Sequence, residues 1–272
     1  MKKIKALLGI FCAASLLAGC SGSMDMSSKW ADEPVQIDGS SDQWKGKTTY
    51  IKEGGLLIGV QNDSDYIYLA LTTSDPGSKR QILMMGLTVW FDAMGGDNKT
   101  FGIKYPIGAR DMGLMNLRRG QDQNDGNNQD MLQELEDNAV NSTTLEVMNS
   151  DDDGMKMEMA DASGVTVKLT RTNDVLIYEL KIAMKESADT RYAIGVNSIR
   201  QIVGLGIETG TIQENKKMGD HEPRGDMGRG NHGPGPGNGD RGSFGHNRPS
   251  MPDPIKQWLT LQLAKNSNAK IR

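Results

Sequence analysis

The stretch from Ile58 to Asp75, Ile-Gly-Val-Gln-Asn-Asp-Ser-Asp-Tyr-Ile-Tyr-Leu-Ala-Leu-Thr-Thr-Ser-Asp, decides the fold. Its turn cluster Asn62–Asp65 separates two runs of alternating polarity, a pattern typical of a β-hairpin. Because strand side chains alternate between faces, the run Tyr66–Leu71 has one aliphatic face and one face that carries two tyrosines. The sequence therefore predicts a sheet with one buried face and one face available to a ligand.

Further apolar runs predict strands along the rest of the chain. The strongest run is Ile82–Asp92, where Leu87, Val89 and Phe91 share one face and Thr88, Trp90 and Asp92 share the other. The other predicted strands are Pro34–Gly39, Lys99–Tyr105, Thr143–Met148, Met155–Met159, Val165–Leu169, Leu176–Ile182, Tyr192–Asn197, Ile202–Ile207 and Ile255–Leu263. About ten to twelve short strands with few helices indicate an all-β fold, a single antiparallel β-sandwich.

The sandwich is predicted to span residues 30–265 and to contain two insertions. Residues 121–161 hold twelve acidic residues and one basic residue, so 121–137 is predicted as a disordered acidic insertion with one helical turn at Met131–Glu136. Gly219–Gly245 contains ten glycines in 27 residues, so the loop 213–253 is also predicted to be disordered. The strand Ile255–Leu263 follows this loop, which therefore lies inside the domain and not in the C-terminal tail 266–272.

The N-terminus has the pattern of a secretory signal. Three lysines precede an apolar run, Ala6–Leu17, which leads into Leu17-Ala-Gly-Cys20 and resembles a bacterial lipoprotein cleavage box. Residues 1–19 are thus a predicted signal peptide, Cys20 a predicted lipidation site and residues 20–29 a predicted tether. Ser21 resembles the outer-membrane sorting class of Gram-negative lipoproteins. The alternative is an ordinary signal peptide in which Cys20 has no role.

Cysteine content and charge exclude several classes of function. Cys12 lies in the predicted signal and Cys20 would carry the lipid, so the mature chain has no disulfide, cysteine nucleophile or thiolate metal site. Removal of residues 1–19 leaves 28 basic and 35 acidic residues, a net charge of about −7. The expected partner is the lipid bilayer, and nucleic acid is not expected.

Several motifs resemble one family of modules. Ile37-Asp38-Gly39 with Trp44, the hairpin strand Asn62–Ala70, Asp75 and Gly86–Asp92 resemble the carbohydrate-binding module family 9 type of β-sandwich, which is related to DOMON domains. The resemblance covers chiefly residues 34–92. It implies a non-catalytic domain that binds an oligosaccharide, and related folds bind haem.

The ligand-binding candidates are the aromatic residues Trp44, Tyr66, Tyr68 and Trp90 together with Asp92. A sugar ring stacks its C–H face on aromatic rings, while carboxylates accept hydrogen bonds from its hydroxyls. If these rings bind a ligand, their truncation should weaken binding more than stability. The alternative is that the rings pack the sandwich or its ends.

No cofactor is predicted outright, but three alternatives are open. His221, His232 and His246 lie in the Gly-rich loop near Met218, Met227 and Met251, a ligand set that suits copper. Asn149–Gly154 begins like a calcium loop, but the twelfth position is Ala160, so a hairpin turn is favoured. Haem would need the methionines Met84, Met85, Met112 or Met115.

An enzyme is not expected from these residues. The histidines lie in the predicted disordered loop, so no Ser-His-Asp arrangement can be argued, and the carboxylates form no recognisable catalytic pair. The remaining alternative is a structural or protein-interaction lipoprotein without a small ligand.

Overall fold

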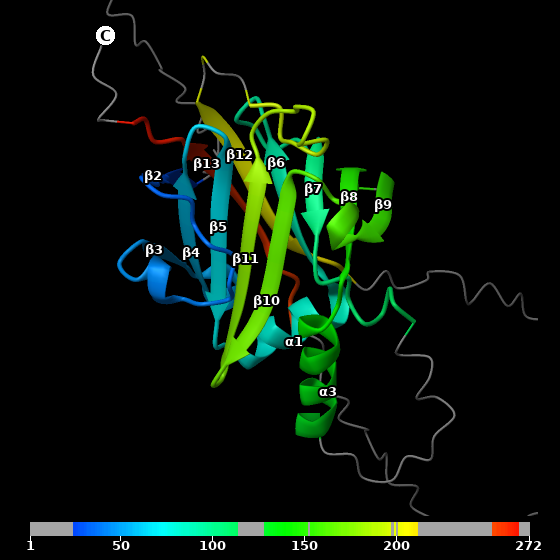
Figure 1. The fold of residues 1–272 in the computed structure, drawn as a ribbon. Coiled ribbons are helices and arrows are strands. Elements are labelled where there is room, and N and C mark those ends of the chain that lie inside the picture. Colours follow the sequence, from blue (N-terminus) through cyan, green and yellow to red (C-terminus); the bar gives the residue numbers. More distant parts are fainter. Residues whose placement is uncertain are drawn as a thin grey trace, which may run out of the picture.

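A computed structural model describes residues 24–113, 128–151, 153–196, 199, 201–211 and 252–266, with the backbone alone for 128–132. Within these ranges, thirteen strands form two sheets that pack face to face (Figure 1). The predicted all-β sandwich is confirmed. The predicted signal peptide, Cys20, the three histidines and nearly all of the loop 213–253 lie outside the described residues.

Sheet A has seven strands in the described part of the chain. Their order is β1 (Met24–Ser27), β13 (Lys256–Gln262), β12 (Ile202–Thr209), β6 (Leu87–Asp92), β7 (Phe101–Lys104), β8 (Thr144–Ser150) and β9 (Asp153–Glu158). All neighbouring strands are antiparallel except β1 and β13, which are parallel.

Sheet B faces sheet A. Its order is β10 (Val165–Thr172), β11 (Val175–Ala183), β5 (Tyr66–Thr73), β4 (Leu56–Asn62) and β2 (Lys29–Trp30), with β3 (Thr48–Ile51) on the first half of β4. Only the short β2 runs parallel to its neighbour among these described pairs. Residues 24–29, which the sequence assigns to a tether, therefore belong to strands of both sheets.

The predicted facing of the two organising strands is confirmed. Six aliphatic and aromatic side chains that the sequence places inward are at most 2% exposed and belong to one core cluster between the sheets: Ile67, Leu69, Leu71, Leu87, Val89 and Phe91. The alternate residues Leu176, Tyr178, Leu180 and Ile182 of β11 join the same core. Burial of this apolar surface is the main force that holds the sheets together.

The predicted β4–β5 hairpin is confirmed. Asn62 pairs with Ile67 across the turn. Asp63 Oδ1 accepts the backbone N–H groups of Asp65 and Tyr66, each at 2.8 Å, and Asp63 Oδ2 accepts the Tyr68 hydroxyl at 2.6 Å. Burial, followed by this hydrogen bond to a carboxylate, raises the pKa of Tyr68 well above its usual value. The aspartate thus fixes both the turn and the first residues of β5.

The predicted strand Ile82–Asp92 is wrong in its first half. Helix α1 spans Pro76–Met85, and β6 begins only at Leu87. Asp75 caps the helix by accepting the Ser78 N–H at 2.7 Å, and Gly86 ends it at a φ of +81°. A short apolar run does not distinguish a buried helical turn from a strand, and the Asp-Pro start and glycine end were the missed signals.

The predicted acidic insertion is partly a packed helix. Helix α3 spans Asn128–Val140 and lies with α1 at one end of the sandwich (Figure 1). Leu135 and Ala139 join the core, so 128–137 is not a disordered segment. Glu136 is buried beside two cations, with Arg171 at 2.8 Å and Lys79 at 3.9 Å.

Two other predicted strands do not form. Residues 34–39 are irregular, and 192–196 make a single bridge, Ala193 to Ala183. The predicted hairpin at Asp151–Gly154 is confirmed as the connection between β8 and β9. Among the described residues, no helix has the length and apolar content needed to cross a bilayer.

Candidate ligand site on the outer face of sheet A

The segment 31–47 covers part of the outer face of sheet B, over β4 and β5. The indole of Trp44 lies flat on β4 above Gly59. If Gly59 carried a Cβ atom, that atom would lie only 2.7 Å from Cε3 of Trp44. Ala31, Trp44, Tyr68 and Ala70 form a second, smaller hydrophobic cluster with Val35 and Ile37 packed against it. A glycine and an alanine on neighbouring strands thus make room for the indole.

Glu179 fastens this covering segment to the sheet. It lies in register with Ala70 on the neighbouring strand β5 and is 0% exposed. Its Oε1 accepts hydrogen bonds from Trp44 Nε1 at 2.6 Å and Gln43 Nε2 at 3.0 Å, and its Oε2 accepts the Gly39 N–H at 2.6 Å. The carboxylate therefore accepts three hydrogen bonds from the segment 31–47 and holds this segment on the sheet.

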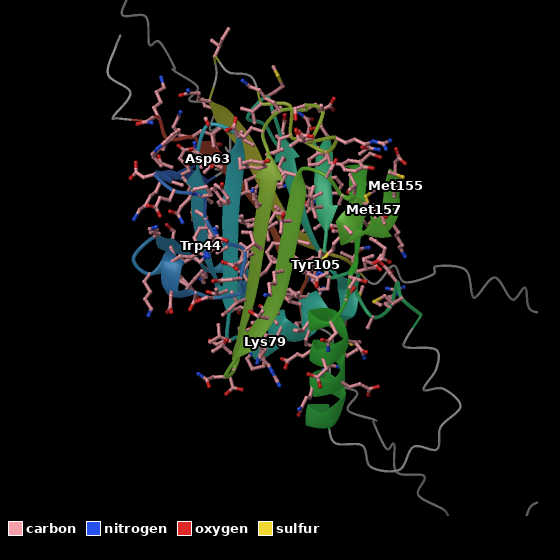
Figure 2. The ribbon with its side chains drawn as sticks, in the orientation of Figure 1. Trp44, Asp63, Lys79, Tyr105, Met155 and Met157 are labelled. Atoms are coloured by element: carbon pink, nitrogen blue, oxygen red, sulfur yellow. The ribbon has the colours of Figure 1, made fainter. Side chains whose placement is uncertain are left out.

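Three of the predicted ligand-binding residues lie in this covered layer. Trp44 is 1% exposed and Tyr68 is 0% exposed, so neither ring offers a face to a ligand. Tyr66 is half-buried, with the ammonium of Lys181 3.9 Å above its ring centroid. The expectation of an aromatic site here is corrected: the tyrosine-bearing face of β5 is buried because residues 31–47 pack over it. Figure 2 shows Trp44 on this side of the molecule.

Trp90 and Asp92 lie on the outer face of sheet A, so the five predicted residues do not form one site. Asp92 is buried and organises the loop that follows it. It accepts the N–H groups of Met94 at 2.8 Å and Asn98 at 3.1 Å and the Asn98 amide at 3.0 Å. Burial alone would raise the pKa of Asp92, but these hydrogen bonds hold it below its usual value. Asp92 shapes a turn and does not face a ligand.

A row of alternating glycines and large side chains crosses the outer face of sheet A. Residues in register on six successive strands, from β9 to β13, are Gly154, Met148, Gly102, Trp90, Gly206 and Trp258. A Cβ on Gly102 would lie 2.6 Å from Cε3 of Trp90, and one on Gly206 would lie 2.7 Å from Cζ2 of Trp258. The large side chains thus lie flat over the glycines.

A row of charged side chains lies beside the row of glycines and large side chains. The residues in register from β9 to β13 are Lys156, Glu146, Lys104, Thr88, Glu208 and Lys256. Opposite charges on neighbouring strands attract each other, and this arrangement stabilises the register. The threonine is the one uncharged member of this described row.

A polar groove of about 550 Å³ lies over these two rows. Its floor includes Thr88, Trp90, Lys104, Glu208 and Lys256, and the segments 209–211 and 254–255 form one wall. Lys99 completes the groove, with its ammonium 5.4 Å from the centroid of the Trp90 ring. This groove is the candidate ligand site.

The charges in the groove are mostly paired. Lys99 Nζ lies 2.6 Å from Asp151 and 2.5 Å from Glu208, and Glu208 also accepts Trp258 Nε1 at 3.2 Å. Lys104 lies between Asp111 and Glu146. Burial alone would lower the pKa of Lys99, but its two carboxylate partners raise it, so Lys99 is charged at neutral pH.

Three polar groups at the groove have no partner among the described residues. The indole Nε1–H of Trp90 is buried without an acceptor. The hydroxyl of Thr88 and the exposed ammonium of Lys256 make no hydrogen bond or ion pair within the described ranges. Unsatisfied donors next to a groove are suited to bonds with a ligand or with water.

A second cavity of about 420 Å³ lies at the hairpin end of the sandwich. Trp30, Met184 and Leu263 give it an apolar lining. Its polar side chains are only partly paired: Asn62 bonds the backbone of Ala264 and Asp63 bonds its own turn, whereas Gln201 Oε1 is buried without a hydrogen-bond partner in the described part of the chain. This cavity differs from the groove chiefly in its more apolar lining.

The residues of the cofactor alternatives are dispersed where the structure describes them. Met84 and Met85 are buried in the core, whereas Met112 is exposed; Met115 and the three histidines lie outside the described residues. Within the described ranges, no group of three or more His, Cys, Asp or Glu residues could hold a metal ion.

Comparison with protein-family models gives no match, and comparison with curated protein sequences gives none either. Two solved structures are similar at low identity, both of a carbohydrate-binding module of family 9 from Caldicellulosiruptor kristjanssonii. The complex with glucose is 12% identical over 68% of this chain and 77% of that chain, with a TM-score of 0.30. The complex with cellotriose is 11% identical over 68% of this chain and 75% of that chain, with a TM-score of 0.32. Because both TM-scores are below 0.5, these two structures lend no support to a shared ligand site.

Proposed function

We propose that the protein is a non-catalytic, lipid-anchored envelope protein that binds a neutral saccharide in the groove on the outer face of sheet A. The observation that carries the proposal is the groove itself, in which unpaired donors lie among paired charges over a tryptophan. Clefts with a few convergent polar groups are the usual sites for small ligands.

The pairing of the charges favours a neutral ligand with many hydroxyls. Lys99 and Lys104 each have carboxylate partners, so an anion at either of these lysines would have to displace an existing ion pair, and Lys256 is the one groove lysine without a partner among the described residues. A hydroxyl both donates and accepts hydrogen bonds, so it can bond an ammonium and a carboxylate of the same pair without displacing either. A saccharide presents such hydroxyls in series.

Trp258 adds apolar contact beside these polar groups, whereas Trp90, which is 2% exposed, supports the groove from below. Trp90 lies beneath the groove, and Trp258 lies half-buried at the end of the same row. Glu208 accepts Trp258 Nε1 and so holds that ring next to the polar floor. An indole held in place beside hydrogen-bonding groups suits the C–H face of a sugar ring.

We expect calorimetry with a panel of neutral oligosaccharides to detect binding by the full mature chain. Thr88→Val, Lys256→Met and Trp90→Phe each remove one unpaired donor at the groove, so each should weaken binding by about three- to tenfold. Trp30→Ala, in the second cavity, is the matched control and should not change affinity. Loss of binding in Trp30→Ala alone would move the site to that cavity. No heat of binding for any sugar would contradict the proposed function.

The lipid anchor is proposed from the N-terminal sequence. Cys20 follows an apolar run and two small residues, and three residues separate it from Met24, where β1 begins. Four extended steps span at most about 14 Å, so an acyl chain on Cys20 would hold sheet A close to the bilayer. An outer-membrane address in a Gram-negative bacterium is part of the proposal.

Intact-mass analysis of the membrane-extracted protein should show an acylated N-terminus at Cys20. Cys20→Ser removes the thiol that carries the lipid, so this variant should lose the added mass and leave the outer-membrane fraction. An unmodified N-terminus on the wild-type chain, or an unchanged product from Cys20→Ser, would contradict lipidation.

A further inference from the structure

Three methionines occupy alternate positions at the edge of sheet A. Met155 and Met157 lie in β9, and Met159 follows directly, with its N–H donating to Thr143 O at 2.8 Å. Met155 pairs with Val147 and Met157 with Leu145, both core residues, so the methionines share the inner face of the strand. Figure 2 shows Met155 and Met157 next to each other beside β8 and β9.

Core packing accounts for only part of this pattern. Met157 and Met159 are half-buried and pack against the core, but Met155 is 49% exposed and is not among the residues packed on it. β9 is the last strand of sheet A in the described part of the chain, so one side of this face is open to solvent. Exposed edge strands usually carry charged residues. An unbranched apolar residue at position 155 therefore calls for another explanation.

The shared chemistry of the three side chains is the thioether. Thioether sulfur is a soft, neutral ligand that selects Cu(I) over hard cations such as calcium or magnesium. Alternate residues of a strand lie about 7 Å apart, and the three rotatable bonds of each methionine let neighbouring sulfurs converge. Lys156 and Glu158 alternate with the methionines and lie on the opposite face, so neither charge lies between the thioethers.

We propose that Met155, Met157 and Met159 form a Cu(I) site on the edge of sheet A. The copper is bound without change of oxidation state, with the three sulfurs as ligands. The site lies on the face opposite to the groove, so it does not depend on saccharide binding. Its proposed ligands do not include the histidines of the loop 213–253.

The test is a titration of the full mature chain with Cu(I), under anaerobic reducing conditions, against a chromogenic Cu(I) chelator. Met→Leu conserves volume, so the triple variant Met155→Leu, Met157→Leu and Met159→Leu should keep its melting temperature. It should bind Cu(I) at least about tenfold more weakly than the wild type. Met94→Leu, at a methionine that is 60% exposed in a loop, is the matched control and should bind like the wild type.

Two further measurements separate the methionine site from the loop histidines. A triple His→Ala variant at positions 221, 232 and 246 should retain the Cu(I) competition of the wild type. The ¹³C-methyl resonances of the three β9 methionines, assigned by the single Leu variants, should shift on addition of Cu(I). Unshifted methyl resonances, or binding that survives the Leu substitutions and disappears with the histidines, would overturn the proposal.

Discussion

Replacement of Glu179 by alanine is expected to lower the free energy of unfolding by about 3–5 kcal/mol. The carboxylate is completely buried and accepts three hydrogen bonds, from Trp44 Nε1, Gln43 Nε2 and the Gly39 N–H. Hydrogen bonds to a charged group contribute more than neutral ones, and the buried donors left behind would lose their acceptor. The loss should be local first, because these bonds hold the segment 31–47 on sheet B.

Urea denaturation followed by tryptophan fluorescence measures this loss, and hydrogen exchange of residues 31–47 locates it. Glu179→Gln keeps one acceptor oxygen, so it should fall between the wild type and Glu179→Ala. Glu158→Ala is the matched control, since this exposed carboxylate accepts one long bond from Thr144 Oγ1 at 3.3 Å. If Glu179→Ala unfolds at the same urea concentration as Glu158→Ala, the proposed fastening role is wrong.

The parts of the fold that were predicted correctly are those that depend on local sequence patterns, such as turn residues and alternating polarity. The hairpin Asn62–Asp65 combines turn residues with clean alternation on both sides, and the structure confirms its register. The core faces of β5, β6 and β11 follow from the same period of two. In these places propensity, polarity and burial all agree.

The first half of Ile82–Asp92 was missed because tertiary packing decides between helix and strand there. Ile82 and Leu83 are buried by the core in the helix as they would be in a strand. The sequence Asp75-Pro76 is compatible with a helix start, but the apolar run that follows is compatible with a strand as well. The helical turn predicted at Met131–Glu136 lies within α3, but the sequence predicts neither the full length of the helix nor its packing, because the burial of Leu135 and Ala139 depends on α1 and β10.

The site could be predicted even less completely, because it depends on strand order. Trp90 was a candidate from its face on β6. Its neighbour Gly102 lies on β7, the next strand along the chain, but its other neighbour Gly206 lies on β12, which is adjacent to β6 in sheet A and distant from it in the sequence. The groove requires that Lys104, Thr88 and Glu208 be in register, which no single strand sequence specifies. Likewise, the burial of Trp44 depends on Gly59, which is near it in the sequence, and on Glu179, which is more than a hundred residues further along the chain.

Replacement of Trp90 by alanine should cost about 3–5 kcal/mol, comparable with the about 2–5 kcal/mol expected for Leu69→Ala in the core. This reverses the expectation that truncation of Trp90 affects binding more than stability. The ring is 2% exposed although it lies on the outer face. Its neighbours in the row, Gly102 and Gly206, have no side chains that could fill the space left by the indole.

Denaturant midpoints of Trp90→Ala, Leu69→Ala and Trp258→Ala test this comparison. Trp258 lies in the same row but is half-buried and bonds Glu208, so its truncation should cost clearly less than that of Trp90. Trp90→Phe keeps a six-membered ring over Gly102 and removes the rest of the indole together with an N–H that has no acceptor, so it should cost less than Trp90→Ala. A nearly neutral Trp90→Ala would mean that the ring is not held against the glycines. The groove floor would then be mobile, and the indole could rotate out to stack on a ligand.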